Sequence, residues 1–270
     1  MYLIATLAND AELMPASTFA LSRELPALSE SAESWGIGYY ADDRALIIQR
    51  PIDPSAPAPV HRVTSDLRSQ VVLACAGRGD PPPYRSRRWL FASIGDLSPL
   101  EALRDTIAEK LPDFVRSDLG EGSGPALAFG MFLAELRRQG VLEDPLVTAE
   151  QVRQVGTRVS DAIRGLSAEV EGEALSAAFV ATNGRLVLGV TLGEPLHLKV
   201  QAGLEALPEG PVDPARTDFK QVAAALKRFR AVVLAHEPGS QGDWRSLPEG
   251  GVVVVDGQLE VIGFDADPPA

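Results

Sequence analysis

Residues 1–9, Met1-Tyr2-Leu3-Ile4-Ala5-Thr6-Leu7-Ala8-Asn9, form the stretch around which we expect the whole chain to be arranged. The run is short and apolar, and the turn pair Asn9-Asp10 closes it, which is typical of a buried central β-strand. In folds that open this way, residue 2 can become the amino terminus and carry both a nucleophile and its own amine as base. Here residue 2 is Tyr, which cannot act as that nucleophile, and we expect its bulk to keep Met1 in place.

The composition predicts a protein that folds by itself and binds neither nucleic acid nor membranes. The chain has 270 residues, of which 45% are hydrophobic, so we expect a single domain over residues 1–270 with a substantial core. A net charge of -12 and a pI near 4.8 disfavour binding to phosphate backbones or anionic lipid, which need clustered Lys and Arg. A local cluster of Arg85, Arg87 and Arg88 is interpreted as the solvated edge of a strand.

Cysteine and histidine usage argues against an internal disulfide and a dedicated metal site. Cys75 is the single cysteine, and the histidines His61, His197 and His236 have no metal-binding spacing. The first residues lack the basic and long apolar segments of a signal peptide, and no uncharged stretch approaches the ~18 residues of a membrane span. We therefore expect a cytoplasmic protein without membrane insertion, cofactor or metal.

Hydrophobic periodicity predicts the order strands, helices, strands, helix, strands. A capping box at residues 98–101 begins a helix that continues to Leu111, and Thr148 with Gln151 begins another. The predicted strands are 1–9, 34–40, 45–48, 70–76, 89–93, 177–182, 186–191, 196–201, 231–235, 252–255 and 259–264, and the other predicted helices are at about 15–25, 125–139 and 218–229. Such grouping favours an α+β fold of two mainly antiparallel sheets covered by helices.

Three further features have both a chemical and a structural interpretation. Cys75 could be a relocated thiol nucleophile, but the apolar run before it favours a buried structural cysteine. The glycine-rich stretch 120–124 lacks the lysine of a phosphate loop and the spacing of a serine elbow, which favours a flexible loop before a helix. His236-Glu237 could be an acid–base pair, but no metal partner or nucleophile lies nearby in the sequence, which favours an ordinary strand end.

The order of several stretches resembles that of a known family. Residues 1–136 contain the opening strand, a Trp-Gly-Ile-Gly-Tyr hairpin at 35–39, a Trp-Leu-Phe-Ala strand at 89–92 that ends in Gly95, and two helices. This order resembles the class II glutamine amidotransferases, and residues 232–255 look like the closing strands of the small bacterial members. The resemblance covers most of the chain and implies an αββα sandwich of the N-terminal nucleophile (Ntn) type.

The resemblance also implies where the catalytic groups would stand, and this chain departs from the family there. The family needs a cysteine nucleophile where this chain has Tyr2, which we expect in the cleft between the sheets. The family's oxyanion hole uses an Asn side chain and a Gly N–H, whereas this chain has Ser93-Ile94-Gly95. A lost donor of this kind typically costs about 3 kcal/mol of transition-state stabilisation.

The substrate-binding positions implied by the resemblance are changed as well. The family's Leu-Ala-His-Val-Arg segment corresponds to residues 73–77, so Gly77 replaces the Arg and Arg78 comes one residue late. The loop at 80–84 keeps only a Pro and an aromatic residue, and Gly124 replaces the Asp that binds the substrate amine. The former pocket would comprise Tyr2, Trp35, Cys75, Gly77, Arg78, Ser93, Ile94 and Gly124.

The scaffold positions persist while four functional positions are lost. We therefore expect a catalytically inactive amidotransferase-like protein, a pseudoenzyme that acts by binding, with a partner protein as its ligand and a homo-oligomer also open. Two alternatives remain at this point. One is an active glutamine or γ-glutamyl amide hydrolase or amidotransferase with altered machinery, and the other is a small-molecule sensor that uses the remodelled pocket.

Overall fold

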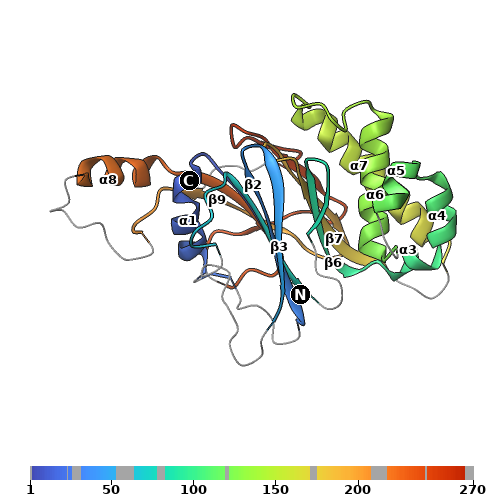
Figure 1. Ribbon diagram of the computed structural model, residues 1–270. Coiled ribbons are helices and arrows are strands. Elements are labelled where there is room, and N and C mark those ends of the chain that lie inside the picture. The colour runs from blue at the N-terminus through green and yellow to red at the C-terminus, as the bar shows by residue number, and fades with distance from the viewer. Residues whose placement is uncertain are drawn as a thin grey trace.

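The computed structural model describes residues 2–22, 24–25, 32–52, 64–77, 83–118, 122–170, 175–207, 218–240 and 242–264. These residues form four layers, in which helices cover the outer faces of two stacked sheets (Figure 1). The α+β sandwich of two antiparallel sheets covered by helices is therefore confirmed.

The first sheet has the opening strand at its centre. Its strands are β1 (Tyr2–Ala8), β2 (Ser34–Ala41), β3 (Arg44–Pro51), β4 (Val71–Gly77), β9 (His197–Ala202), β10 (Arg230–Ala235) and β11 (Arg245–Ser246). Their order is β11-β9-β10-β1-β4-β2-β3. β1 pairs antiparallel with β10 on one side and with β4 on the other, as expected for a central strand.

The second sheet lies against the first and is antiparallel throughout its described strand pairs. Its strands are β5 (Tyr84–Ser86), β6 (Trp89–Asp96), β7 (Ser176–Thr182), β8 (Val187–Leu192), β12 (Val252–Val255) and β13 (Val261–Ile262). Their order is β13-β12-β8-β7-β6-β5. The two sheets bury an apolar core between them to which both contribute alternate residues.

β1 is apolar along its whole length because both of its faces are buried. Leu3, Ala5 and Leu7 point into the core between the sheets. Ile4 and Ala8 point to the other side, where helices cover the first sheet. A strand buried on both faces reads as a continuous hydrophobic run rather than an alternating one, which explains the pattern of residues 2–8.

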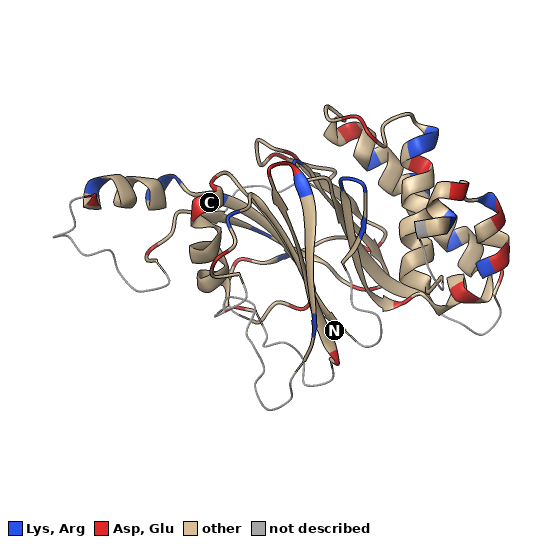
Figure 2. Ribbon diagram, viewed as in Figure 1, with Lys and Arg blue, Asp and Glu red and all other residues tan. Residues whose placement is uncertain are grey.

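The helices form the two outer layers. α1 (Met14–Leu21), preceded by the 3-10 turn η1 (Ala11–Leu13), and α8 (Phe219–Arg228) pack on the first sheet. α3 (Ser98–Ala102), α4 (Arg104–Lys110), α5 (Asp113–Asp118), α6 (Gly124–Arg138) and α7 (Ala149–Ser167) cover the second. Charged residues lie on the outer sides of the helices that cover the second sheet, whereas the strands in the interior are mostly uncharged (Figure 2).

One of the two predicted capping boxes is confirmed and the other is wrong. Thr148 and Gln151 exchange both hydrogen bonds at the start of α7. At the start of α3, Ser98 lies inside the helix, and the Glu101 carboxylate accepts the N–H of Gly124 at 2.7 Å instead. Glu101 therefore satisfies the first turn of α6, which lies far away in the sequence. The predicted helix 98–111 is also divided, because Leu103 has the non-helical angles φ -104° and ψ 18°.

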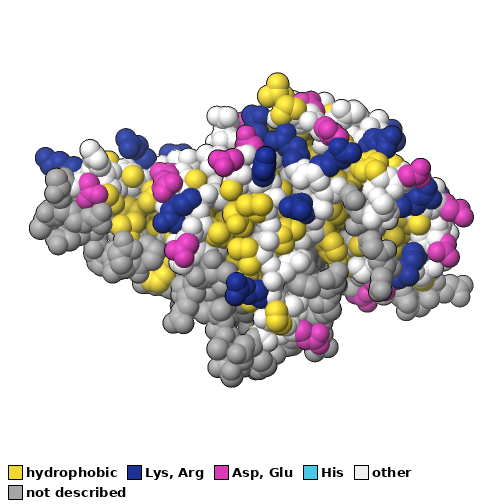
Figure 3. All heavy atoms as spheres, viewed as in Figure 1, with side chains coloured by type: hydrophobic (Ala, Val, Ile, Leu, Met, Phe, Trp, Pro, Cys, Tyr) yellow, Lys and Arg dark blue, Asp and Glu magenta, His cyan; other side chains and the backbone are white. Residues whose placement is uncertain are grey.

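The described residues were expected to contain neither a membrane-spanning helix nor a metal site. Within those segments, no helix is long and apolar enough to cross a membrane. The same residues contain no group of three or more His, Cys, Asp and Glu side chains placed to hold a metal ion. On the face drawn in Figure 3, apolar side chains reach the surface in separate groups bordered by charged ones.

Substitution of Phe91 tests the core between the second sheet and its helices. The Phe91 ring is fully buried and stacks on Phe129 at 5.2 Å and on Phe179 at 5.1 Å between ring centroids. We predict that Phe91→Ala lowers the free energy of unfolding by about 3–5 kcal/mol, because it removes buried area and leaves a cavity. Urea denaturation measures this, with Leu146→Ala as the control because Leu146 is 71% exposed. Equal losses in the two variants would contradict the assigned core.

Candidate functional site

Tyr2 begins β1, and its side chain lies on the face of the first sheet that α1 covers. The ring is 2% exposed and shares an apolar cluster with Trp35 of β2 and Met14 of α1. Tyr2 and Trp35 both stand opposite Ala76 of β4, one on each side, so their rings lie on the same face. The expected position of Tyr2 in the cleft between the sheets is therefore wrong. Side chains alternate along a strand, and it is Leu3 that points between the sheets.

Cys75 and Ile94 lie in the core between the sheets. Cys75 belongs to β4 and Ile94 to β6, and they are 1% and 3% exposed. The Cys75 thiol donates to the carbonyl oxygen of Gly36 over 3.7 Å, and burial raises the pKa of this thiol well above its ordinary value. A nucleophilic cysteine needs a lowered pKa and access to substrate. Cys75 has neither, which supports the structural interpretation.

Gly95 is required by the local geometry of the sheet. Its φ is +84°, a left-handed backbone conformation that residues other than glycine rarely adopt. A Cβ atom there would come within 2.1 Å of the Ser176 carbonyl oxygen and 2.7 Å of the Glu194 Cγ. Steric requirements alone thus explain Gly95, the glycine that the resemblance assigns to the oxyanion hole.

Ser93 and Gly124 lie on the opposite side of the second sheet, toward the helices. Ser93 stands opposite Phe179, whose ring packs in the helix-facing core, and the Ser93 hydroxyl is buried without a hydrogen-bond partner among the described residues. Gly124 is the first residue of α6. A Cβ atom at Gly124 would come within 2.4 Å of the Leu97 carbonyl oxygen, so an Asp at this position would not fit the observed packing.

Gly77 is the last residue of β4 and pairs with Ser34. Arg78 and Met1 lie outside the described residues, as do residues 80–82 and 120–121 of the two loops interpreted above. The positions that the family resemblance places in one pocket are thus distributed over three layers where they are described. Tyr2 and Trp35 face α1, Cys75 and Ile94 lie between the sheets, and Ser93 and Gly124 face the helices of the second sheet.

A polar cluster that the sequence did not predict lies beside the start of β1. The His236 N–H donates to the Leu3 carbonyl oxygen at 2.9 Å, which places His236 at this end of the strand. Its Nε2 is 3.2 Å from a Glu194 carboxylate oxygen, and the Ser176 hydroxyl donates to the other carboxylate oxygen at 2.9 Å. Glu194 is 42 residues from His236 and 18 from Ser176, so no local spacing in the sequence signals the contact.

The order of groups in this cluster does not form a catalytic triad. A triad places the histidine between the serine and the carboxylate, so that the histidine can take the serine proton. Here Glu194 lies in the middle and the Ser176 proton is directed to it. The Glu237 carboxylate is 3.9 Å from His236 Nδ1 and 70% exposed, so the strand-end interpretation of this pair is supported over the acid–base one. The cluster joins the ends of β7, β8 and β10.

Gly95→Ala tests whether this glycine is kept by the fold. We predict a loss of about 1–3 kcal/mol in the free energy of unfolding, because the new side chain must adopt a positive φ and displace backbone atoms. Gly77→Ala is the matched control, since no atom lies within 4 Å of a Cβ at Gly77. Chemical denaturation of both variants gives the difference. If Gly95→Ala is as stable as the control, the steric explanation fails.

The chain has no detectable relatives by sequence in two comparisons. No family model matches it, and no curated protein matches it.

Solved structures show what its fold is similar to. A glutamine aminotransferase class-II domain protein from Silicibacter pomeroyi superposes with a TM-score of 0.57 and 16% identity, over 98% of this chain and 99% of that one. A predicted glutamine amidotransferase from Pseudomonas aeruginosa gives 0.56 and 16%, over 97% and 95%. Glutamine phosphoribosylpyrophosphate amidotransferase from B. subtilis gives 0.53 and 11%, over 99% of this chain and half of that one. The protein therefore has the Ntn fold of the class II glutamine amidotransferases.

Proposed function

We propose that this chain is a catalytically inactive glutamine amidotransferase-like protein that acts in the cytoplasm by binding a partner protein. The observation that carries the proposal is the residue at the head of β1. Tyr2 is 2% exposed beneath the layer of α1, and burial raises the pKa of its phenol well above the ordinary value. A buried, protonated phenol cannot attack an amide carbon as the cysteine thiolate of an amidotransferase does.

The other groups needed for amide hydrolysis do not compensate for the missing nucleophile. Ile94 supplies no hydrogen-bond donor, and the geometry around Gly95 accounts for that glycine without a catalytic role. The buried Cys75 thiol has a raised pKa, and the Ser176 hydroxyl is directed to Glu194 rather than to a histidine. The Cys75 thiol is therefore buried and protonated, and the Ser176 hydroxyl has no histidine to take its proton.

The proposal predicts that the wild-type protein releases no ammonia or glutamate from glutamine. We expect the same of Tyr2→Cys, even if Met1 is then removed. One missing oxyanion donor lowers the rate by about 10² to 10³, and a misplaced substrate lowers it by about another 10². The measurement is a coupled glutamate assay, with the amino terminus identified by intact mass. Turnover by the wild type would overturn the proposal and favour the alternative of an enzyme with altered machinery.

The structure requires a stability control in this experiment. Replacing the buried Tyr2 ring by a small side chain is expected to cost about 3–5 kcal/mol, as for other buried aromatic residues. Tyr2→Phe keeps the ring and serves as the matched variant. Circular dichroism of all three proteins at the assay temperature establishes that inactivity reflects missing chemistry and not unfolding. Activity in a folded Tyr2→Cys alone would show a pocket more complete than the positions of Ile94 and Gly124 imply.

The burial of Cys75 gives a separate prediction for the relocated-thiol alternative. We expect the native protein to react with a thiol reagent such as DTNB at least about 10³-fold more slowly than the same protein in urea, because reaction requires local or global opening. The unfolded chain should then react with one equivalent, since Cys75 is the single cysteine. Fast reaction of the folded protein would show an accessible thiolate and would return Cys75 to consideration as a nucleophile.

A further inference from the structure

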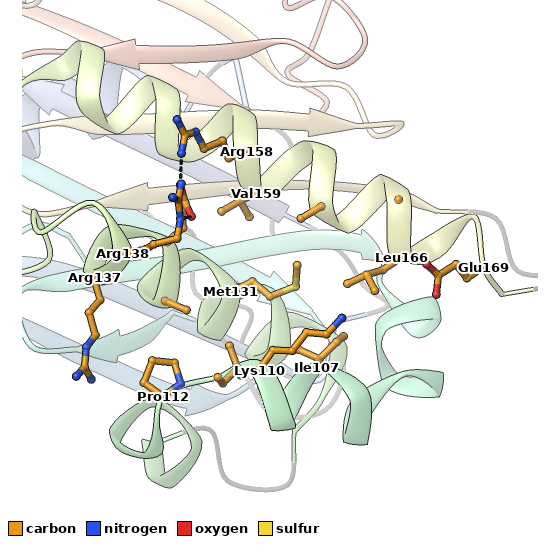
Figure 4. A pocket seen from close by; sticks show the side chains of 15 residues that line it. Ile107, Lys110, Pro112, Met131, Arg137, Arg138, Arg158, Val159, Leu166 and Glu169 are labelled. Carbon is orange, nitrogen blue, oxygen red and sulfur yellow. Dashed lines mark hydrogen bonds and ion pairs between the residues drawn. The ribbon is translucent and has the colours of Figure 1, made fainter.

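A groove crosses the helical layer on the outer side of the second sheet. It has a volume of about 730 Å³, and its walls come from α4 on one side and α7 on the other, with α6 between them (Figure 4). The apolar lining includes Ile107 of α4, Met131 of α6, and Val159 and Leu166 of α7. This is a volume and an apolar character typical of binding sites.

The lining of the groove follows two helices. Along α7, the lining extends from Arg158 to Leu166, about 12 Å at ~1.5 Å per residue. Along α6, it extends from Met131 to Arg138, about 10 Å on the same scale. A trough of this length between two helical walls over a helical floor corresponds to about two turns of another helix, at ~5.4 Å per turn. Such grooves receive the apolar face of an amphipathic helix.

The rim of the groove is positively charged, although the whole chain carries a net charge of -12. Among the described residues, the lining contains the cations Lys110, Arg137, Arg138 and Arg158 and the carboxylates Glu135 and Glu169, a balance of four against two.

Two of the four cations have no carboxylate partner among the described residues. Glu135 already pairs with Arg138 at 2.6 Å and with Arg158 at 3.5 Å. Lys110 and Arg137 form no ion pair in the described part of the chain, and Arg137 lies over the Phe114 ring at 5.0 Å. Figure 4 places the three arginines toward one end of the groove and Glu169 toward the other. The groove therefore complements a ligand that is apolar on one face and negatively charged beside it.

Gly165 leaves open space in the wall formed by α7. It lies inside the helix, where glycine costs roughly 0.5–1 kcal/mol relative to alanine. No atom lies within 4 Å of a Cβ placed at Gly165, so packing within the chain does not require a glycine there. A residue without a side chain on a groove wall allows the backbone of a docked helix to approach closely.

We propose that this groove docks an amphipathic helix of a partner protein, with its apolar face on Met131 and Leu166 and its carboxylates beside Lys110 and Arg137. This inference rests on the proposed binding function and names its surface and the chemistry of its partner. The charge on the rim favours an acidic helix over a basic one, because close opposite charges steer association and like charges oppose it.

Two synthetic peptides test the proposal with the full-length protein. Both are fluorescein-labelled 14-residue helices with Leu at positions spaced i, i+3, i+4, i+7 and i+11, flanked by Glu in one peptide and by Lys in the other. Fluorescence anisotropy should show saturable binding of the Glu peptide and at least about tenfold weaker binding of the Lys peptide. The double variant Lys110→Glu with Arg137→Glu should reverse this preference.

A blocking variant and its control locate the binding. Gly165→Leu adds a side chain to the groove wall at a position where a Cβ atom meets no other atom within 4 Å. It should weaken binding of the Glu peptide at least about tenfold, or about 1.4 kcal/mol. Gln154→Leu adds the same side chain to an exposed part of α7 that does not line the groove, and it should leave binding unchanged. Thermal unfolding checks that both variants are as stable as the wild type.

Several outcomes would overturn the proposal. They are equal or absent binding of the two peptides, an unchanged affinity in Gly165→Leu, and binding of dodecanoate at this groove in place of the peptide. Sedimentation that shows self-association lost in Gly165→Leu would make the occupant a second copy of the chain and would also overturn it. The readout is binding and not turnover, so its failure is distinct from glutaminase activity, which would overturn the proposed function.

Discussion

The structure depends on the burial of β1 on both faces. Hydrogen bonds to β10 and β4 hold the strand in the middle of the first sheet, and its alternating side chains enter two different cores. Because side chains alternate with a period of two, a one-residue shift of register would exchange the two cores completely. The position of Tyr2 is therefore fixed by Leu3 and Leu7, which must face the second sheet. The same constraint moves the phenol away from the cleft in which the family resemblance placed it.

Two glycines at positions that the resemblance assigns to the family's site are explained by the fold. Gly95 cannot carry a side chain because of its positive φ and the Ser176 carbonyl. Gly124 cannot carry one because α6 begins against the backbone of Leu97, where Glu101 accepts its N–H. By the resemblance, Gly95 keeps a family residue and Gly124 replaces one, yet steric requirements explain both. The identity of a glycine is thus weak evidence about function, because steric requirements of the fold can account for it.

The sequence predicted the layers of the fold well and the site poorly, for one physical reason. The run of residues 2–8 and the capping box at Thr148 are local patterns, and local patterns fix strands and helices. Glu101 does cap a helix, but its carboxylate accepts the N–H of Gly124 at the start of α6, because tertiary packing places that helix end beside it. The cluster of Glu194 with His236 depends on strand neighbours that are distant in sequence. Which face a residue occupies and which partners it meets are decided by register, and register is not a local property.

The two functional inferences concern opposite sides of the molecule. Tyr2 lies beneath α1 on the outer face of the first sheet, whereas the groove lies in the helices outside the second sheet. Both sheets and the apolar core between them separate the two places. A change at the head of β1 that preserves the buried ring therefore leaves the helical layer undisturbed, since contacts so far apart contribute to stability nearly independently. In such an architecture, the residue at the head of β1 and the groove between α4, α6 and α7 can vary independently, so the groove can keep its shape and charge whatever chemistry the first sheet supports.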